Sequence, residues 1–154
     1  MAGATILVLN GPNLNLLGVR EPAIYGHETL ADLEALCRKA CDAHGLELVF
    51  RQSNFEGEIV DWLQEARVGA AGVVINPAAF CYYSVAIIDA LRMVECPVIE
   101  VHISHIHGRE PEWRSKTITA AACDAMISGA GLHGYVLAID DLAHRLKAKQ
   151  ATAA

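Results

Sequence analysis

Two residues near the N-terminus, Arg20 and Tyr25, have the types and spacing of an activated base. They lie five residues apart in a loop rich in Gly and Pro that follows an apolar segment. A tyrosine has a reference pKa near 10 and acts as a base only when a cation favours its phenolate, and an arginine keeps its charge. The loop therefore predicts a Tyr25 base activated by Arg20. The alternative is a surface loop with an ordinary tyrosine, because Gly and Pro are chiefly turn residues.

A second pair, Glu100 and His102, has the spacing of an oriented acid. The two residues are two apart in an apolar segment, so on a strand they point to the same side of the sheet. A glutamate beside a histidine orients the ring and favours its charged form. His102 is therefore a candidate general acid, with a salt bridge at a strand end as the alternative.

Other common site chemistries are disfavoured by the residue pattern. His102, His105 and His107 cluster, but a strand that runs into a loop points them in different directions, so we expect no metal. The four lysines lie outside the apolar strands, which disfavours imine chemistry. The first loop also lacks the Gly-rich and Ser/Thr patterns of phosphate sites, including an FMN site. We expect no cofactor.

The elements that position these residues alternate along the chain. Apolar runs predict five strands, and amphipathic stretches between them predict helices. Thr29 is a candidate helix cap, and the tail 147–154 is expected to fray. The strands are expected at 6–9, 46–51, 72–75, 98–101 and 125–128, and the helices at 30–44, 58–68, 84–94 and 137–147.

This alternation predicts an α/β fold of the flavodoxin-like, doubly wound class. Its five-stranded parallel sheet is covered by helices on both faces, and residues 1–154 form a single catalytic domain. Ligands of such sheets bind at the carboxyl ends of the strands. Three strand ends carry polar residues and are expected to meet there: Asn10–Asn13, Asn76–Pro77 and Glu100–Ser104.

Composition narrows the class of protein. The chain has 154 residues, 53% of them hydrophobic, and a net charge of -6, which argues against a nucleic-acid partner. No apolar run is long enough to span a bilayer, and no signal peptide is expected. The five cysteines are odd in number and form no CxxC, so we expect reduced thiols and a cytoplasmic protein. High apolar content with few charges also favours self-association.

Segments spread through most of the chain together resemble the type II 3-dehydroquinate dehydratases, in that family's order. The chain length is also that of the family. The matching segments are 10–18 (NGPNLNLLG), 20–22 (REP), 25–26 (YG), 51–54 (RQSN), 56–57 (EG), 61–62 (DW), 76–77 (NP), 84–86 (SVA), 89–91 (DAL), 100–104 (EVHIS), 106–107 (IH) and 109–110 (RE).

The resemblance implies a cofactor-free dehydration of 3-dehydroquinate to 3-dehydroshikimate by anti elimination. Tyr25 would remove the pro-S hydrogen at C2, with Arg20 promoting its ionisation and stabilising charge. An enolate would form, and His102, oriented by Glu100, would protonate the departing C1 hydroxyl. A lid loop around residues 18–26 would close over the substrate.

The resemblance also implies further site residues and a partner. Asn13 and Arg109 would line the tyrosine pocket, and Asn76 would hold the substrate and a water near the enolate. The carboxylate would be held by the backbone amides of Ile103 and Ser104. Asp89 would reach in from a neighbouring subunit of a homo-oligomer, a dodecamer built of trimers. Arg114 is the expected substrate arginine.

One substrate-binding segment departs from the family pattern. After Asn-Pro the family usually has Gly-Ala, an aromatic, then Thr-His-Thr-Ser, so Tyr82 stands where the family has a substrate-binding histidine. A tyrosine is bulkier and is not cationic near neutral pH. The remaining departures are Cys81 and Tyr83 for the flanking threonines, Ile88 for an arginine, His105 for an asparagine, and an extra Pro111 before Arg114.

These observations leave three hypotheses. The leading one is a hydro-lyase that acts on 3-dehydroquinate. The second is a paralogue that dehydrates a related cyclic β-hydroxy ketone, since one change in a site built around hydroxyls redirects specificity. The third is a binding relic that keeps the fold but not turnover.

Overall fold

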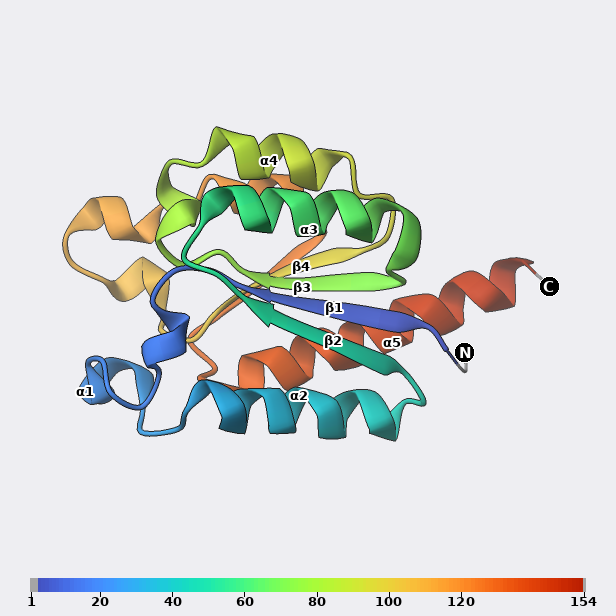
Figure 1. Ribbon diagram of the computed structural model, residues 1–154, viewed down its shortest axis with the longest axis horizontal. Helices are drawn as coiled ribbons and strands as arrows, with labels where there is room; N and C mark the ends of the chain where they lie inside the picture. The colour runs from blue at the N-terminus through green and yellow to red at the C-terminus, as the bar shows by residue number, and fades with distance from the viewer. Residues whose placement is uncertain (1–2, 154) are drawn as a thin grey trace.

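The computed structural model describes residues 3–153 and contains a parallel five-stranded sheet in the order β2-β1-β3-β4-β5. Helices cover both of its faces (Figure 1), which confirms the expected flavodoxin-like fold. The strands are β1 (Thr5–Asn10), β2 (Glu47–Gln52), β3 (Gly72–Asn76), β4 (Val98–His102) and β5 (Ala125–Ser128). The helices are α1 (Pro22–Tyr25), α2 (Leu30–Ala43), α3 (Glu56–Gly69), α4 (Val85–Arg92) and α5 (His133–Ala153).

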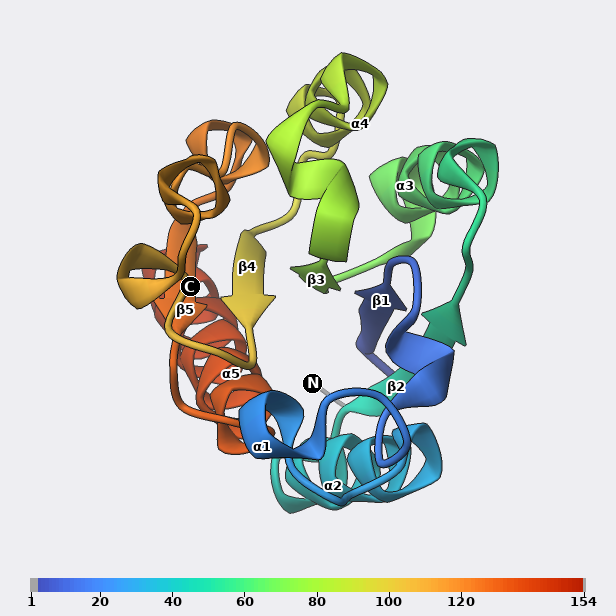
Figure 2. The ribbon, with the colours of Figure 1, turned by 90° about the vertical axis from the view of Figure 1, so that its left-hand side faces the viewer.

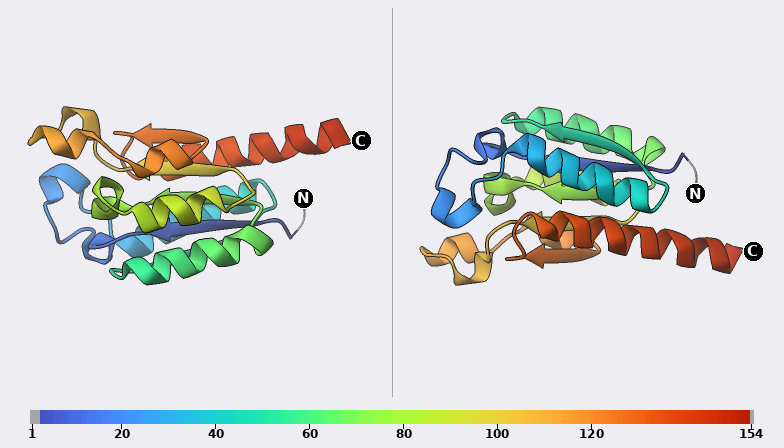
Figure 3. Two further views of the ribbon diagram at one scale, coloured as in Figure 1. Left: turned by 90° about the horizontal axis from the view of Figure 1, so that it is seen from above. Right: turned by 90° about the horizontal axis from the view of Figure 1, so that it is seen from below.

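Two apolar layers hold the helices to the sheet. α2 and α5 pack on one face, around residues such as Leu33 and Ile139, and α3 and α4 pack on the other, around Leu63 and Ile87. Figure 2 shows the sheet between these layers, and Figure 3 shows each pair of helices from its own side. Because both faces are covered, β1, β3 and β4 are buried almost throughout, as continuous apolar runs predict.

The helix boundaries follow their capping residues. Thr29 caps α2 as predicted, and the cap is reciprocal: the Thr29 hydroxyl accepts from the Asp32 backbone N–H, and the Asp32 carboxylate accepts from the Thr29 backbone N–H. Ser84 caps α4 with a single bond, in which its hydroxyl accepts from the Ile87 N–H. Within residues 3–153, no helix is both long and apolar enough to cross a membrane.

The last helix differs from the prediction at both ends. α5 begins at His133, four residues before the expected start, and is helical to Ala153. Fraying of the tail 147–154 stays a prediction, and Ala154 lies outside the described residues. Alanine, lysine and glutamine favour helix, which accounts for the extension. Gly134, in the first turn of α5, occupies a crowded site. A Cβ there would lie 3.3 Å from Val101 Cγ1, so glycine lets α5 approach the sheet closely.

The carboxyl ends of the five strands lie at one end of the parallel sheet. Short 3₁₀ helices follow them: η1 (Leu14–Leu16), η2 (Ala78–Tyr82), η3 (Ile106–Gly108), η4 (Glu112–Ser115) and η5 (Thr119–Ala122). η1, α1, η3 and η4 gather at this end, on the left in Figure 1, opposite the two termini.

The loops after β1 and β3 cross closely at Gly11. The Gly11 N–H donates to the Asn76 carbonyl at 2.8 Å, and a Cβ at Gly11 would lie 2.4 Å from the Pro77 carbonyl oxygen. A side chain there meets backbone, which has no rotamer to yield, so the crossing requires glycine.

We therefore expect Gly11→Ala to lower the free energy of unfolding by about 1–3 kcal/mol, the usual cost of overpacking. Gly57→Ala is the matched control, because Gly57 lies in α3 with nothing within 4 Å of an added Cβ. That variant should gain about 0.5–1 kcal/mol from helix propensity. Urea denaturation measures both changes. Equal stability of the two variants would contradict the conclusion that the loop crossing requires glycine at position 11.

Candidate active site

A pocket opens at the carboxyl end of the sheet, between the loop after β1 and the segment after β4. The empty space in the pocket and at its mouth, open solvent included, is about 770 Å³. Ten of the twelve predicted site residues line it: Asn13, Arg20, Tyr25, Asn76, Tyr82, His102, Ile103, Ser104, Arg109 and Arg114. The other two are Glu100, which lies behind His102, and Asp89.

Glu100 is fully buried in β4 and bonds to His102. Its Oε1 lies 2.6 Å from His102 Nε2. An ionised carboxylate only accepts hydrogen bonds, so Nε2 carries the hydrogen between them. His102 Nδ1 is then the ring nitrogen left for a ligand in the pocket.

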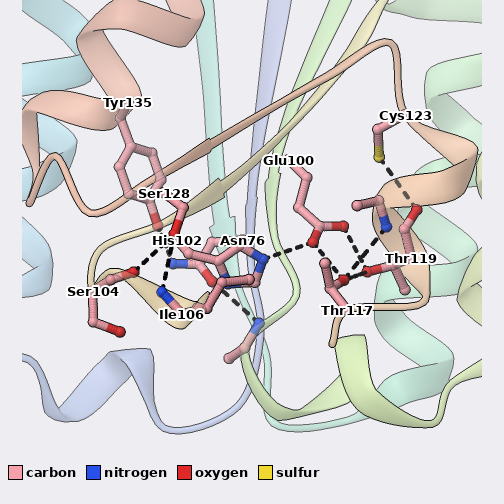
Figure 4. A network of polar contacts seen from close by, with 12 residues as sticks. Asn76, Glu100, His102, Ser104, Ile106, Thr117, Thr119, Cys123, Ser128 and Tyr135 are labelled. Atoms are coloured by element: carbon pink, nitrogen blue, oxygen red, sulfur yellow. Dashed lines mark hydrogen bonds and ion pairs between the residues drawn. The ribbon is translucent and has the colours of Figure 1, made fainter. Parts of the chain in front are cut away.

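Two threonines that the sequence analysis missed complete the partners of Glu100. Thr117 Oγ1 donates to Glu100 Oε1 at 2.7 Å, and Thr119 Oγ1 donates to Oε2 at 2.6 Å. Figure 4 shows both hydroxyls on the side of the carboxylate opposite His102. Each Glu100 oxygen therefore has a donor, which is the condition for keeping a buried carboxylate. No sequence pattern marked these threonines, because they lie at and just before the start of η5, far from Glu100 in the sequence.

Tyr25, in α1, contacts two arginines. Arg109 Nη1 donates to the Tyr25 hydroxyl at 2.8 Å, and the Arg109 guanidinium carbon lies 5.6 Å from the ring centroid. Arg20 lies 5.9 Å from the same centroid, but its Nε pairs with Glu21 at 3.1 Å. Arg20 therefore lies near the Tyr25 ring, whereas Arg109 makes the direct contact with the hydroxyl. The role of Tyr25 as a base stays a prediction.

The segment after β4 presents backbone donors to the pocket. The carbonyls of Ile103 and Ser104 accept from Gly131 and Ser128 on the β5 side. In the part of the chain that the structure describes, the N–H groups of Ile103 and Ser104 have no protein acceptor. Because both residues line the pocket, a ligand carboxylate is a fitting partner for these amides.

An aromatic wall closes another side of the pocket. The Tyr82 ring packs edge-on against Trp113, with centroids 5.1 Å apart, and the Arg114 guanidinium carbon lies 5.0 Å from the Trp113 centroid. Burial raises the pKa of Tyr82, so its hydroxyl stays neutral. Trp113 lines the pocket and was not predicted from the sequence. The wall offers a ligand two ring edges, a neutral hydroxyl and the Arg114 cation.

Beneath that wall, Cys81 lies close to the buried acid. Burial, and then the charge of Glu100, raise the pKa of the Cys81 thiol to about 12. The thiol therefore stays protonated near neutral pH and adds no charge to the site. In residues 3–153, no three His, Cys, Asp or Glu side chains gather as metal ligands would. The absence of a cofactor stays a prediction.

Asp89 is the predicted site residue that lies apart. It is exposed on α4 and does not line the pocket of its own chain. Val85, one turn earlier, is 61% exposed on the same face of α4. Within one chain, the pocket therefore lacks Asp89.

The arrangement as a whole suits proton transfer. A tyrosine hydroxyl held by Arg109 and an imidazole held by Glu100 line the same pocket. One can accept a proton and the other can donate one to a ligand between them, with backbone amides available to fix a carboxylate.

Comparisons with known proteins agree with this geometry. The family model described as dehydroquinase class II matches residues 4–143. The chain is 55% identical over 144 residues to a 3-dehydroquinate dehydratase of Streptomyces coelicolor, covering 93% of this chain and 91% of that protein. It is 54% identical over 146 residues to 3-dehydroquinate dehydratase 2 of Pseudomonas putida, covering 95% and 97%. The crystal structure of type II dehydroquinase from Butyrivibrio crossotus superposes with a TM-score of 0.88 at 47% identity, covering 91% and 97%. The chain therefore belongs to the class II dehydroquinase family.

Proposed function

We propose that this protein dehydrates 3-dehydroquinate to 3-dehydroshikimate. The observation that carries the proposal is the pairing of Tyr25 with Arg109 and of His102 with Glu100 around one pocket. Family membership and the names of the relatives support the same substrate.

The reaction is an elimination through an enolate. The Tyr25 phenolate takes the pro-S proton from C2, and the C2–H electrons form the enolate with the neighbouring carbonyl. The enolate then expels the C1 hydroxyl, which leaves as water with a proton from the His102 imidazolium. Glu100 holds the His102 ring in place for this transfer, and Arg20 and Arg109 lie beside Tyr25. The amides of Ile103 and Ser104 hold the substrate carboxylate. Asn76 holds the substrate and a water near the enolate, and Asn13 lines the tyrosine pocket.

The first test follows enone absorbance from 3-dehydroquinate in the wild type and in Tyr25→Phe. Phe keeps the ring but removes the proposed base, so kcat should fall about 10²–10⁴-fold. Tyr83→Phe is the matched control, because Tyr83 is exposed and does not line the pocket. More than a tenth of wild-type kcat in Tyr25→Phe would exclude it as the base. A folded wild type without turnover would favour the binding relic.

The proposal includes assembly, because the pocket of one chain lacks Asp89. We infer that Asp89 enters the site of a neighbouring subunit, in a dodecamer built of trimers. The exposed face of α4 that carries Val85 and Asp89 supports contact between copies there.

Mixed oligomers of Asp89→Asn and Tyr25→Phe test this arrangement. Each variant alone should be inactive. If Asp89 acts across a subunit boundary, equal mixing after dissociation should restore about one site in four, because some sites then combine an intact Tyr25 with a neighbour's intact Asp89. No recovery on mixing, or a fully active monomer in sedimentation, would contradict it.

A second candidate function is dehydration of a related cyclic β-hydroxy ketone. Tyr82 and Trp113 favour it, since they form an aromatic wall of the pocket. The family resemblance implies a histidine at position 82 that reads ring hydroxyls. The proposed base, the proposed acid and the backbone amides that hold the carboxylate would serve the same chemistry on either substrate.

Tyr82→His separates the two candidates. If 3-dehydroquinate is the substrate, the histidine should raise kcat/KM about threefold to tenfold, which corresponds to one recovered hydrogen bond of about 0.5–1.5 kcal/mol. A fall in kcat/KM in a variant of unchanged stability would indicate a pocket adapted to Tyr82, and hence a different natural substrate.

A further inference from the structure

Tyr135 is a polar residue at the centre of the molecule to which the proposed mechanism gives no role. It lies in the first turn of α5 and is fully buried. Its hydroxyl lies 2.8 Å from Asn76 Nδ2 and 2.8 Å from Asn10 Oδ1. Asn10 and Asn76 are paired neighbours at the ends of β1 and β3, so the hydroxyl joins two strands and a helix. Figure 4 shows Tyr135 and Asn76 of this group.

Backbone contacts determine the direction of the two hydrogen bonds that link Asn10, Tyr135 and Asn76. Asn10 Nδ2 donates to the Arg51 carbonyl at 3.1 Å, so Asn10 turns its oxygen toward Tyr135. Asn76 Oδ1 accepts from the Ala78 N–H at 3.1 Å, so Asn76 turns its nitrogen toward Tyr135. The Tyr135 hydroxyl therefore donates to Asn10 and accepts from Asn76.

The consequence for Asn76 is a fixed orientation of its carboxamide. Nδ2 carries two hydrogens, and one is bound to the Tyr135 hydroxyl. In the described part of the chain, the second has no protein acceptor, and Asn76 lines the pocket. Burial raises the pKa of Tyr135, so its hydroxyl keeps the hydrogen that the chain of bonds requires.

We propose that Tyr135 is a positioning residue for the reaction. Its hydroxyl, oriented by Asn10, holds the Asn76 carboxamide so that the second N–H serves the substrate, or the water at the developing enolate. A fixed donor aimed at developing charge costs no reorganisation during the reaction. This inference rests on the proposed function, since it concerns the same reaction.

A purely structural role for Tyr135 predicts a different result. Tyr135→Phe leaves the Asn76 donor and the Asn10 acceptor without their partner and lowers stability in either case. If the hydroxyl also positions Asn76, it lowers turnover of the folded enzyme, and only while Asn76 is present.

A double-mutant cycle between Tyr135→Phe and Asn76→Ala makes this distinction. In the wild-type background, Tyr135→Phe should lower kcat about tenfold or more. In the Asn76→Ala background, the same change should alter kcat less than about twofold, because nothing is left to position. Substitution of the buried Ile139 on α5 by Val or Ala, chosen to match the denaturation midpoint of Tyr135→Phe, should leave kcat unchanged.

The outcomes separate this inference from the proposed function. An active wild type in which Tyr135→Phe equals the Ile139 control, or lowers kcat equally in both backgrounds, overturns the role of Tyr135 alone. A folded wild type that does not convert 3-dehydroquinate overturns both. If Tyr135→Phe does not fold, Asn10→Ala takes its place in the cycle, because it removes the acceptor that orients the same hydroxyl; additive losses with Asn76→Ala then overturn the proposal.

Discussion

The buried carboxylate of Glu100 is the constraint on which the site depends. Glu100 is fully buried in β4, where a charge without hydrogen-bond partners would be strongly destabilising. The fold provides three donors: His102 from the same strand, and Thr117 and Thr119 from the segment before β5. The hydroxyls lie on one side of the carboxylate and the imidazole on the other. The requirement to satisfy Glu100 therefore also fixes the ring of His102, the proposed acid, against the pocket.

A thiol also lies close to this carboxylate. Burial, and then the charge of Glu100, raise the pKa of the Cys81 thiol to about 12. A thiol is a weak donor, so Cys81 is a poor partner for a carboxylate. The hydroxyl donors to Glu100 are Thr117 and Thr119. The site thus keeps its buried acid satisfied while the adjoining wall carries Tyr82 and Trp113.

The parallel sheet brings the two halves of the proposed chemistry together. β1 delivers Asn10 and the loop to Tyr25, β3 delivers Asn76, and β4 delivers His102, all at one edge. The glycine at position 11 lets the first loop cross the backbone after β3. From α5, Tyr135 forms hydrogen bonds with Asn10 and Asn76 at the same end of the sheet. A helix on one face of the sheet thereby contacts the polar ends of two strands.

The sequence by itself determined the architecture and most of the site. Apolar runs alternating with amphipathic stretches specify a parallel α/β sheet, and the carboxyl ends of its strands must meet. The strand ends that carry Asn13, Asn76 and His102 are therefore expected together, and all three residues line one pocket. The direct contact of Arg109 with Tyr25, the threonines around Glu100, and the hydroxyl of Tyr135 were decided by tertiary structure alone. Each joins segments far apart in the chain, and Tyr135 looks like an ordinary core residue in the sequence. Local patterns record periodicity and propensity, whereas hydrogen-bond partners depend on which distant side chains the packed fold brings within about 3 Å.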